Sequence, residues 1–375
     1  MGKKTFGFLA VLVIMAAAVM IIIKTSNGTD DEDSKSKKTV LHSIEEVADR
    51  LNSEFDSGKD GTAKLYISNS ISDDDLKKVN MSINSMKGSI ESFTTYSSNV
   101  DNLSDSYREV DFEYKRSDTM FVYDNIVNKV AIPEDRQEAI RLRNVCEKIL
   151  NDHVKNYMSD YDKEIAIHDY IVNNCEYGFS ENKDDSEYTA YGCLVNRKAV
   201  CSGYSAAANL LLMCAGVECK IVTGLATQMV DGKESSENHA WNQVKIDGEW
   251  YHLDVTWDDP VGDRAVLIHE YFNVSDSVIN RNHETYSSNA SKCESMRSNY
   301  YMKNGAYLYD VASLENYVRI CMSTGNSHHF ECALNGITVT DETLQFIYDY
   351  TGVESVRYSL EGSREYNILS VYINE

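Results

Sequence analysis

The chain has 375 residues, of which 25% are charged, and a formal net charge of −23 at pH 7. This length accommodates one main globular domain together with one or two smaller units. The negative charge, with no basic stripe and no recognition motif, excludes nucleic acid as an expected partner. Acidity of this size indicates a well-solvated surface and says little about a specific partner.

The first 24 residues differ in character from the rest of the chain. Lys3 and Lys4 precede an apolar run without charge over residues 6–23. As a helix this run is about 27 Å long, close to the hydrocarbon core of a bilayer at about 30 Å. We therefore expect residues 1–24 to be an uncleaved membrane anchor, with the N-terminus cytoplasmic and the remainder extracellular. A cleaved signal sequence, which would make the protein secreted, is the alternative.

Residues 25–39 are polar and lack periodicity, which indicates a flexible stalk. Residues 40–130 follow as a small α/β accessory region, in which no catalytic set of side chains is visible, so a packing or binding role is expected. The predicted elements of this region are a helix over 39–51, a strand over 62–68, a helix from Ser72, and strands over 107–114 and 120–127.

The main domain is predicted over residues 131–285. Pro133 favours the first turn of a long helix that runs to about Tyr157. A second helix, rich in Ala and Leu, is predicted over 202–214 and ends at Gly216. A strand over 217–222 follows, and Gly224 is expected to end it.

Cys201 stands at the start of the second helix, in the segment VCSGYS. The unpaired N–H groups and partial positive charge of a helix N-terminus favour a thiolate over a thiol. The same N–H groups would stabilise an oxyanion. The alternative is a buried, unreactive cysteine, which is the usual situation of a free cysteine in a protein.

A β-hairpin is predicted for the segment HAWNQVKIDGEWYHLDVTW, with its turn at Asp247-Gly248. The hairpin would place Asp254 beside His239, where the carboxylate orients the imidazole and selects its tautomer. His252 lies on the same strand face as Asp254 and competes with His239 for the role of base. Together, Cys201, His239 and Asp254 are the parts of a nucleophilic triad.

These motifs, with AYGCLVNRKAV before Cys201 and HEYFNVSD after the hairpin, resemble the transglutaminase-like superfamily of papain-type thiol enzymes, in particular its bacterial, membrane-anchored or secreted members. The resemblance spans residues 157–283 and implies an α+β fold in which the nucleophile helix packs on an antiparallel sheet. It places the nucleophile on Cys201, the base on His239 and the orienting acid on Asp254. The oxyanion or substrate contacts fall on Tyr191, the backbone N–H of Cys201 and Trp241.

The resemblance also implies a reaction at an amide. The thiolate would attack a glutamine side chain or a peptide carbonyl to form a thioester, which an amine or water then resolves. Transglutamination, deamidation and peptide hydrolysis all remain open. The expected partners are protein or peptide substrates, cell-wall peptides among them, and no cofactor is expected.

Two other hypotheses compete with a thiol enzyme. The accessory regions would suit a non-catalytic cell-surface binding protein that keeps the fold. A metal-binding module would use Cys201, His239, His252 and Asp254. The nine cysteines include no C-x-x-C pair, so no structural zinc site is predicted, and no calcium loop of the EF-hand type is visible. Disulfides among the other eight cysteines stay unassigned.

Residues 286–375 are predicted as a C-terminal α/β extension. After a polar stretch the pattern alternates between strands and helices to the end of the chain. Four tyrosines in this part, at positions 300, 301, 307 and 309, indicate a sheet surface, with stacking on a carbohydrate as the alternative.

Overall fold

We describe the fold from a computed structural model. The described residues are 39–44, 46–47, 50–51, 61–72, 93–102, 106–179, 185–230, 233–259, 267–287, 290–323, 329–351, 356–362 and 366–373. The predicted anchor, all of the predicted stalk except Thr39, and the helix expected after Ser72 lie outside these residues. Within the described part, no helix is both long and apolar enough to cross a membrane.

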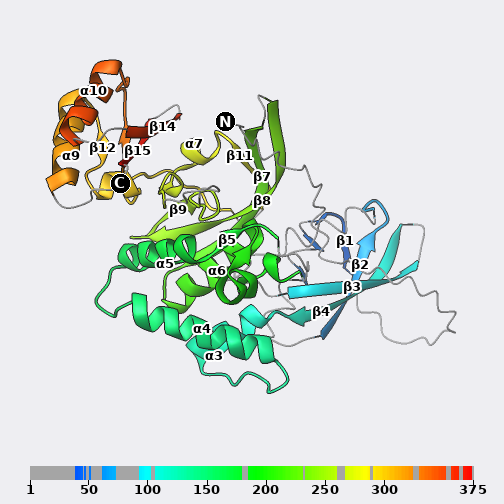
Figure 1. The fold of residues 1–375 in the computed structure, drawn as a ribbon. Coiled ribbons are helices and arrows are strands. Elements are labelled where there is room, and N and C mark those ends of the chain that lie inside the picture. Colours follow the sequence, from blue (N-terminus) through cyan, green and yellow to red (C-terminus); the bar gives the residue numbers. More distant parts are fainter. Residues whose placement is uncertain are drawn as a thin grey trace, which may run out of the picture.

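The N-terminal unit is a four-stranded sheet with the order β1-β2-β4-β3 (Figure 1). Its strands are β1 (Val40–Leu41), β2 (Gly61–Ser68), β3 (Phe93–Asn102) and β4 (Tyr107–Arg116). The strands predicted over 62–68 and 107–114 are confirmed. The helix predicted over 39–51 starts later than expected, because residues 40–41 pair with β2 instead.

The strand predicted over 120–127 is wrong, because this segment forms helix α3 (Asp118–Asn128). The Ser117 side chain caps the helix by accepting a hydrogen bond from the backbone N–H of Met120, and Lys129 ends it in the left-handed conformation. Val122 is fully buried, and α3 packs against the next helices of the chain. The β-branched and aromatic residues favour a strand, but the cap and the packing outweigh that preference.

The main unit packs helices on an antiparallel five-stranded sheet with the order β10-β9-β8-β7-β11 (Figure 1). The sheet consists of β7 (Cys219–Val230), β8 (Lys233–Ile246), β9 (Glu249–Leu253), β10 (Phe272–Val274) and β11 (His283–Thr285). The helices are α4 (Gln137–His153), α5 (Asp160–Asn174), α6 (Cys201–Cys214) and the short α7 (Asp276–Ile279). The expected α+β arrangement, with the helix of Cys201 against an antiparallel sheet, is confirmed.

Short elements complete the main unit between α5 and α6. They are the strands β5 (Glu176–Tyr177) and β6 (Lys198–Ala199), a 3₁₀ turn η1 (Ser186–Tyr188) and a π-helical turn η2 (Gly192–Asn196). The helix expected from Pro133 begins only at Gln137, because Pro133 lies in a turn that accepts a hydrogen bond from Arg136.

Helix α6 is the centre of the main core. Ten consecutive residues, 203–212, are buried, and most are Ala or Leu. A helix that is apolar on all sides is stable only when other elements surround it. Gly216 follows with φ +81°, and the N–H groups of Gly216 and Val217 bond to the carbonyls of Met213 and Leu212. This is the predicted helix end at Gly216.

The expected break at Gly224 is wrong, because β7 runs through this residue to Val230. Gly224 pairs with His239 on one side and with Thr285 of β11 on the other. A Cβ atom at this position would lie 1.8 Å from the carbonyl oxygen of Glu284. Glycine is therefore needed for the close approach of β11 rather than for a turn.

The C-terminal unit is a second mixed layer that shares its core with the main sheet. Its elements are α8 (Tyr300–Lys303), β12 (Tyr307–Leu308), α9 (Val311–Ser323), β13 (His329–Leu334), α10 (Asp341–Thr351), β14 (Val356–Gly362) and β15 (Asn367–Ile373), with strand order β12-β13-β15-β14. Val222 and Trp241 of the main sheet lie in one apolar cluster with Leu314 and Phe330 of this unit. The C-terminal extension is thus packed onto the sheet that carries the predicted site.

We predict that Gly224→Ala destabilises the fold by about 1–3 kcal/mol, because the added methyl group forces β11 away from β7. The measurement is the free energy of unfolding from denaturant titration. Gln228→Ala, at an exposed position further along β7, is the matched control and should change the free energy of unfolding by less than about 0.5 kcal/mol. Equal stability of the two variants would contradict the close-approach explanation.

Candidate active site

Cys201 is the first residue of α6 and is partly exposed. Val200 precedes it in an extended conformation and accepts hydrogen bonds from the N–H groups of Gly203 and Tyr204 at 2.8 and 3.1 Å. A Cβ atom on Gly203 would lie 2.4 Å from the carbonyl oxygen of Glu187, so only glycine allows this close packing. Cys201 therefore lies at the N-terminal end of α6, where the partial positive charge of a helix favours a thiolate.

The predicted hairpin is present. Its register determines how His239 and Asp254 lie relative to each other. Gln243 lies opposite His252, and the turn residues Asp247 and Gly248 both have positive φ. Two positive φ values in a two-residue turn match the right-handed twist of the strands. As a result, β8 presents His239 to the residue that follows β9, Asp254.

Asp254 is completely buried and fully hydrogen bonded. Its Oδ2 accepts from Nε2 of His239 at 2.7 Å and from Nε2 of His283 at 3.0 Å. Its Oδ1 accepts from the backbone N–H groups of Thr256 and Trp257 at 3.1 and 3.2 Å. Burial alone would raise the pKa of Asp254, but the two histidines lower it well below its usual range. The carboxylate is therefore ionised at every physiological pH.

His239 connects the carboxylate to the thiol. Burial alone would lower the pKa of His239, but the charge and hydrogen bond of Asp254, with a hydrogen bond to Cys201, raise it to about 10. Because Nε2 is used by Asp254, Nδ1 is the ring nitrogen left to face Cys201. His239 is thus held as an imidazolium at neutral pH, next to the sulfur.

His283 was not predicted from the sequence as part of the site. It lies on β11, is 4% exposed, and donates to the same oxygen of Asp254 as His239 does. Burial, the largest cause, and the nearby His239 lower the pKa of His283, although Asp254 acts in the opposite sense. Nδ1 of His283 lies 2.7 Å from Oδ1 of Asn282, so the ring is held at both nitrogens and supports Asp254 from β11. No local motif could reveal this residue, because 29 positions separate it from Asp254.

His252, the alternative candidate for the base, bonds to Trp241 and Asp276. Its Nδ1 accepts from Nε1 of Trp241 at 2.9 Å, and its Nε2 bonds to Oδ1 of Asp276 at 2.9 Å. Trp241 is 1% exposed, and its ring stacks near-parallel on His239 at 5.9 Å between centroids. Trp241 therefore supports His239 from within the core rather than offering a surface to a substrate. His252 is grouped with Asp276 and not with Cys201, so the four ligands of the hypothetical metal-binding module do not converge.

Tyr191 immediately precedes the π-helical turn and packs, half-buried, against the main core. Tyr177 is closer to the chemistry: β5 pairs in parallel with β6, so Tyr177 lies beside Ala199, two residues before Cys201. Burial and then the charge of Cys201 raise the pKa of Tyr177, so its hydroxyl stays protonated and can donate a hydrogen bond. Tyr177 could not be predicted from the sequence, because the two-residue pairing of β5 and β6 has no local signature.

All nine cysteines are free thiols in this structure. Seven of them are buried, and only Cys201 and Cys214, at the two ends of α6, are partly exposed. Burial raises the pKa of Cys214 to about 12. Of the two accessible thiols, only Cys201 has a histidine beside it.

A known protein family matches the part of the chain that carries this site. The family model of the transglutaminase-like superfamily matches residues 147–255, from within α4 to just past Asp254. This segment is transglutaminase-like. The resemblance stated from the sequence motifs is therefore confirmed for this segment.

Curated relatives of the transglutaminase-like segment are kyphoscoliosis peptidases. The mouse protein (Mus musculus) is 26% identical over 124 residues, and the human protein (Homo sapiens) is 26% identical over 117 residues. These alignments cover 32% and 30% of this chain, but only 19% and 18% of the relatives, so the chain spans about a fifth of their length. A crystal structure of a TGase superposes with a TM-score of 0.29 at 16% identity, over 56% of this chain and 55% of that chain. At that score the superposition carries no argument.

We predict that Cys201 is alkylated rapidly well below pH 8.5, where an ordinary thiol is mostly protonated. The imidazolium of His239 stabilises the thiolate, and this stabilisation is present at neutral pH and is lost as the pH rises through about 10. The measurement is the labelling rate against pH, read by peptide mass spectrometry, in the wild type and in His239→Ala. Cys214 in the same samples is the internal control. Labelling of Cys201 that is unchanged in His239→Ala would contradict the pairing.

We predict that His283→Ala slows the low-pH labelling of Cys201 by about tenfold, by analogy with the loss of an outer hydrogen-bond partner of a functional histidine. His283 lines a cavity of about 640 Å³, so removing its ring lets water compete for Asp254. His283→Gln can keep a donor toward Asp254 and should recover most of the rate. A purely structural role would shift stability in both variants without this difference between them, and circular dichroism with thermal melting separates the two cases.

Proposed function

We propose that the protein is a thiol enzyme that cleaves or transfers amide bonds through Cys201, His239 and Asp254. The observation that carries the proposal is the position of His239, which bonds to a buried carboxylate on one side and to the partly exposed thiol of Cys201 on the other. The family match supports it, because the matched residues 147–255 contain all three side chains. The substrate is a protein or peptide that presents a glutamine side chain or a peptide bond.

The geometry supports the following sequence of bonds. The Cys201 thiolate attacks the carbonyl carbon, a C–S bond forms, and the carbonyl π electrons move to oxygen. The C–N bond then breaks as the leaving amine takes a proton from the His239 imidazolium. Neutral His239 next accepts a proton from water or from a second amine as either attacks the thioester, and the thiolate is released. Throughout, Asp254 stays ionised and keeps the imidazole in place.

We assign the stabilisation of the negatively charged carbonyl oxygen to the backbone N–H of Cys201 and the hydroxyl of Tyr177. The first is a free donor of the helix N-terminus, which also carries a partial positive charge. The second stays protonated, because burial and the neighbouring Cys201 raise its pKa. Donors of this kind act by being oriented in advance toward the charge that develops.

We further propose that the enzyme works outside the cytoplasm, anchored by residues 1–24. The support is the uncharged run over residues 6–23 behind Lys3 and Lys4. The polar segment 25–39 would then connect the anchor to the folded part. Peptide of the cell wall or protein of the cell surface would be the substrate within reach.

The test is turnover of a glutamine- and lysine-containing protein such as casein, with a fluorescent primary amine present. Amine incorporation reports transfer, ammonia release without incorporation reports deamidation, and new fragments report proteolysis. We expect one of these activities, reduced at least about a thousandfold in Cys201→Ala. Cys214→Ala, which removes the other accessible thiol of α6, is the matched control and should keep the activity.

Two results would overturn the proposal. Activity that persists in Cys201→Ala would place the chemistry elsewhere. Absence of turnover, together with an ordinary labelling profile of Cys201, would favour the non-catalytic binding protein that keeps this fold. If casein is not turned over but Cys201 is reactive, other substrates must be tested. Cell-wall peptides are the first of these.

A further inference from the structure

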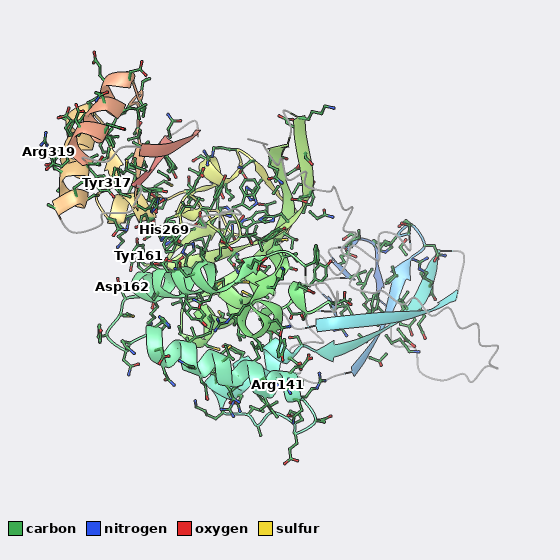
Figure 2. All side chains as sticks on the ribbon, viewed as in Figure 1. Arg141, Tyr161, Asp162, His269, Tyr317 and Arg319 are labelled. Atoms are coloured by element: carbon green, nitrogen blue, oxygen red, sulfur yellow. The ribbon has the colours of Figure 1, made fainter. Side chains whose placement is uncertain are left out.

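A second histidine pair lies apart from the predicted triad, between α5, the segment before β10 and the C-terminal unit. His168 is on α5, next to Asp169, and His269 precedes β10. Oδ1 of Asp169 lies 3.0 Å from Nδ1 of His168 and 3.0 Å from Nε2 of His269. The three atoms lie within 4.8 Å of one another. Figure 2 labels His269 near Tyr161 of α5, on the side of the C-terminal unit.

The other nitrogen of each ring bonds to a second carboxylate. Nε2 of His168 lies 3.1 Å from Oδ2 of Asp258, and Nδ1 of His269 bonds to Oε1 of Glu331 on β13. Asp258 is 0% and Glu331 5% exposed. Both carboxylates are themselves held, since the N–H of Tyr271 donates to Asp258 and the hydroxyl of Tyr301 donates to Glu331.

The hydrogen-bond partners of His168 and His269 are an unusual combination for two buried rings. Every ring nitrogen of His168 and His269 faces a carboxylate oxygen, so each needs a proton or another cation there. With protons alone, either both rings are charged while their centroids are 5.1 Å apart inside the protein, or a buried carboxyl group must carry a proton. Two like charges so close in a buried site repel strongly. One divalent cation in place of the two inner protons leaves the total charge unchanged and both rings neutral.

We propose that His168 Nδ1, His269 Nε2 and Asp169 form a metal site for a divalent transition-metal ion, with Zn²⁺ as the expected occupant. Ligating histidines in proteins nearly always donate their outer N–H to a carboxylate or carbonyl, and both histidines here do so, to Asp258 and Glu331. Nitrogen and oxygen ligands at about 2.0–2.1 Å from a tetrahedral zinc ion are about 3.3 Å apart. The observed 3.0 Å spacings require only a small expansion.

Asp169 is the solvent-accessible member of the proposed site. The side chains of His168 and His269 are 0% and 5% exposed, but that of Asp169 is 37% exposed. A metal ion would therefore be reached from the Asp169 side, where water completes the fourth position, as in sites with three protein ligands. No short spacing in the sequence reveals the site, because a hundred positions separate Asp169 from His269.

Among the residues that the structure describes, the other two groups of convergent ligands suit a metal less well. In the group of His252, Asp276 and Cys293, Nε2 of His252 would coordinate and its proton would have to move to Nδ1. The N–H of Trp241 already points at that nitrogen, so two donors would face each other. In the group of His239, Asp254 and His283, the imidazole that would coordinate is the partner of Cys201.

The proposed ion would join three parts of the molecule. It would tie α5 to the segment before β10 and, through Glu331, to β13 of the C-terminal unit. It would also steady the segment that carries the predicted triad acid. Asp258, which holds His168, donates its own N–H to the carbonyl of Asp254 at 3.2 Å.

The experiment uses the full-length chain in detergent, stripped with a chelator and titrated with Co²⁺ as a spectroscopic substitute for Zn²⁺. We expect one Co²⁺ per chain, with visible bands of a nitrogen and oxygen site and no thiolate charge-transfer band. Competition with Zn²⁺ should remove the bands, and Zn²⁺ should raise the melting temperature. Asp169→Asn, at a partly exposed position, should weaken binding at least about tenfold, and Glu331→Gln about 10–100-fold. Asp276→Asn is the matched control and should bind as the wild type does.

Three results would overturn the proposal. The first is the absence of stoichiometric Co²⁺ or Zn²⁺ binding by the wild-type chain, which does not depend on any variant folding. The second is binding that Asp169→Asn leaves intact. The third is a thiolate band, or loss of binding in Asp276→Asn, which would place the ion with Cys293 or at another cysteine. None of these readouts requires an active enzyme, so they are independent of the proposed amide chemistry.

Discussion

The burial of an ionised carboxylate at Asp254 is the constraint on which the site depends. A charge in a dry interior is stable only when fixed donors replace the water that it loses. Asp254 has four such donors, two from backbone N–H groups and two from the histidines 239 and 283. These donors are placed by three features of the fold: the hairpin register, the turn after β9 and the approach of β11. His239 receives its charge and its orientation as a consequence.

The close approach of β11 shows how backbone packing supports this electrostatic arrangement. His283 reaches Asp254 only because β11 lies directly against β7, and β7 has no side chain at Gly224 to prevent it. On the opposite side, the stack of Trp241 on His239 is fixed by the bond from Trp241 to His252. The imidazole is thus confined by a carboxylate, a ring and a thiol. Such confinement reduces the reorganisation needed when charge moves between His239 and Cys201.

The parts of the structure that local patterns control could be predicted from the sequence. Helix α6 and its end at Gly216, and the turn at Asp247-Gly248, follow from composition and turn chemistry. The strand expected over 120–127 failed because a cap and a buried face override the preference of β-branched residues. His283 and Tyr177 could not be predicted, since strand pairings between distant segments bring them to the site. The catalytic roles of Cys201, His239 and Asp254 stay predictions that only activity can test.

Two carboxylate–histidine assemblies meet in the segment that follows β9. Asp254, at its start, holds His239 and His283, whereas Asp258, one turn later, holds His168 of the proposed metal site. The hydrogen bond from the N–H of Asp258 to the carbonyl of Asp254 joins them directly. Displacement of Asp258 would therefore move the turn whose N–H groups bind Oδ1 of Asp254. Glu331 of β13 bonds to His269, which is linked to Asp258 through Asp169 and His168. Docking of the C-terminal unit therefore contributes indirectly to the placement of the predicted triad acid.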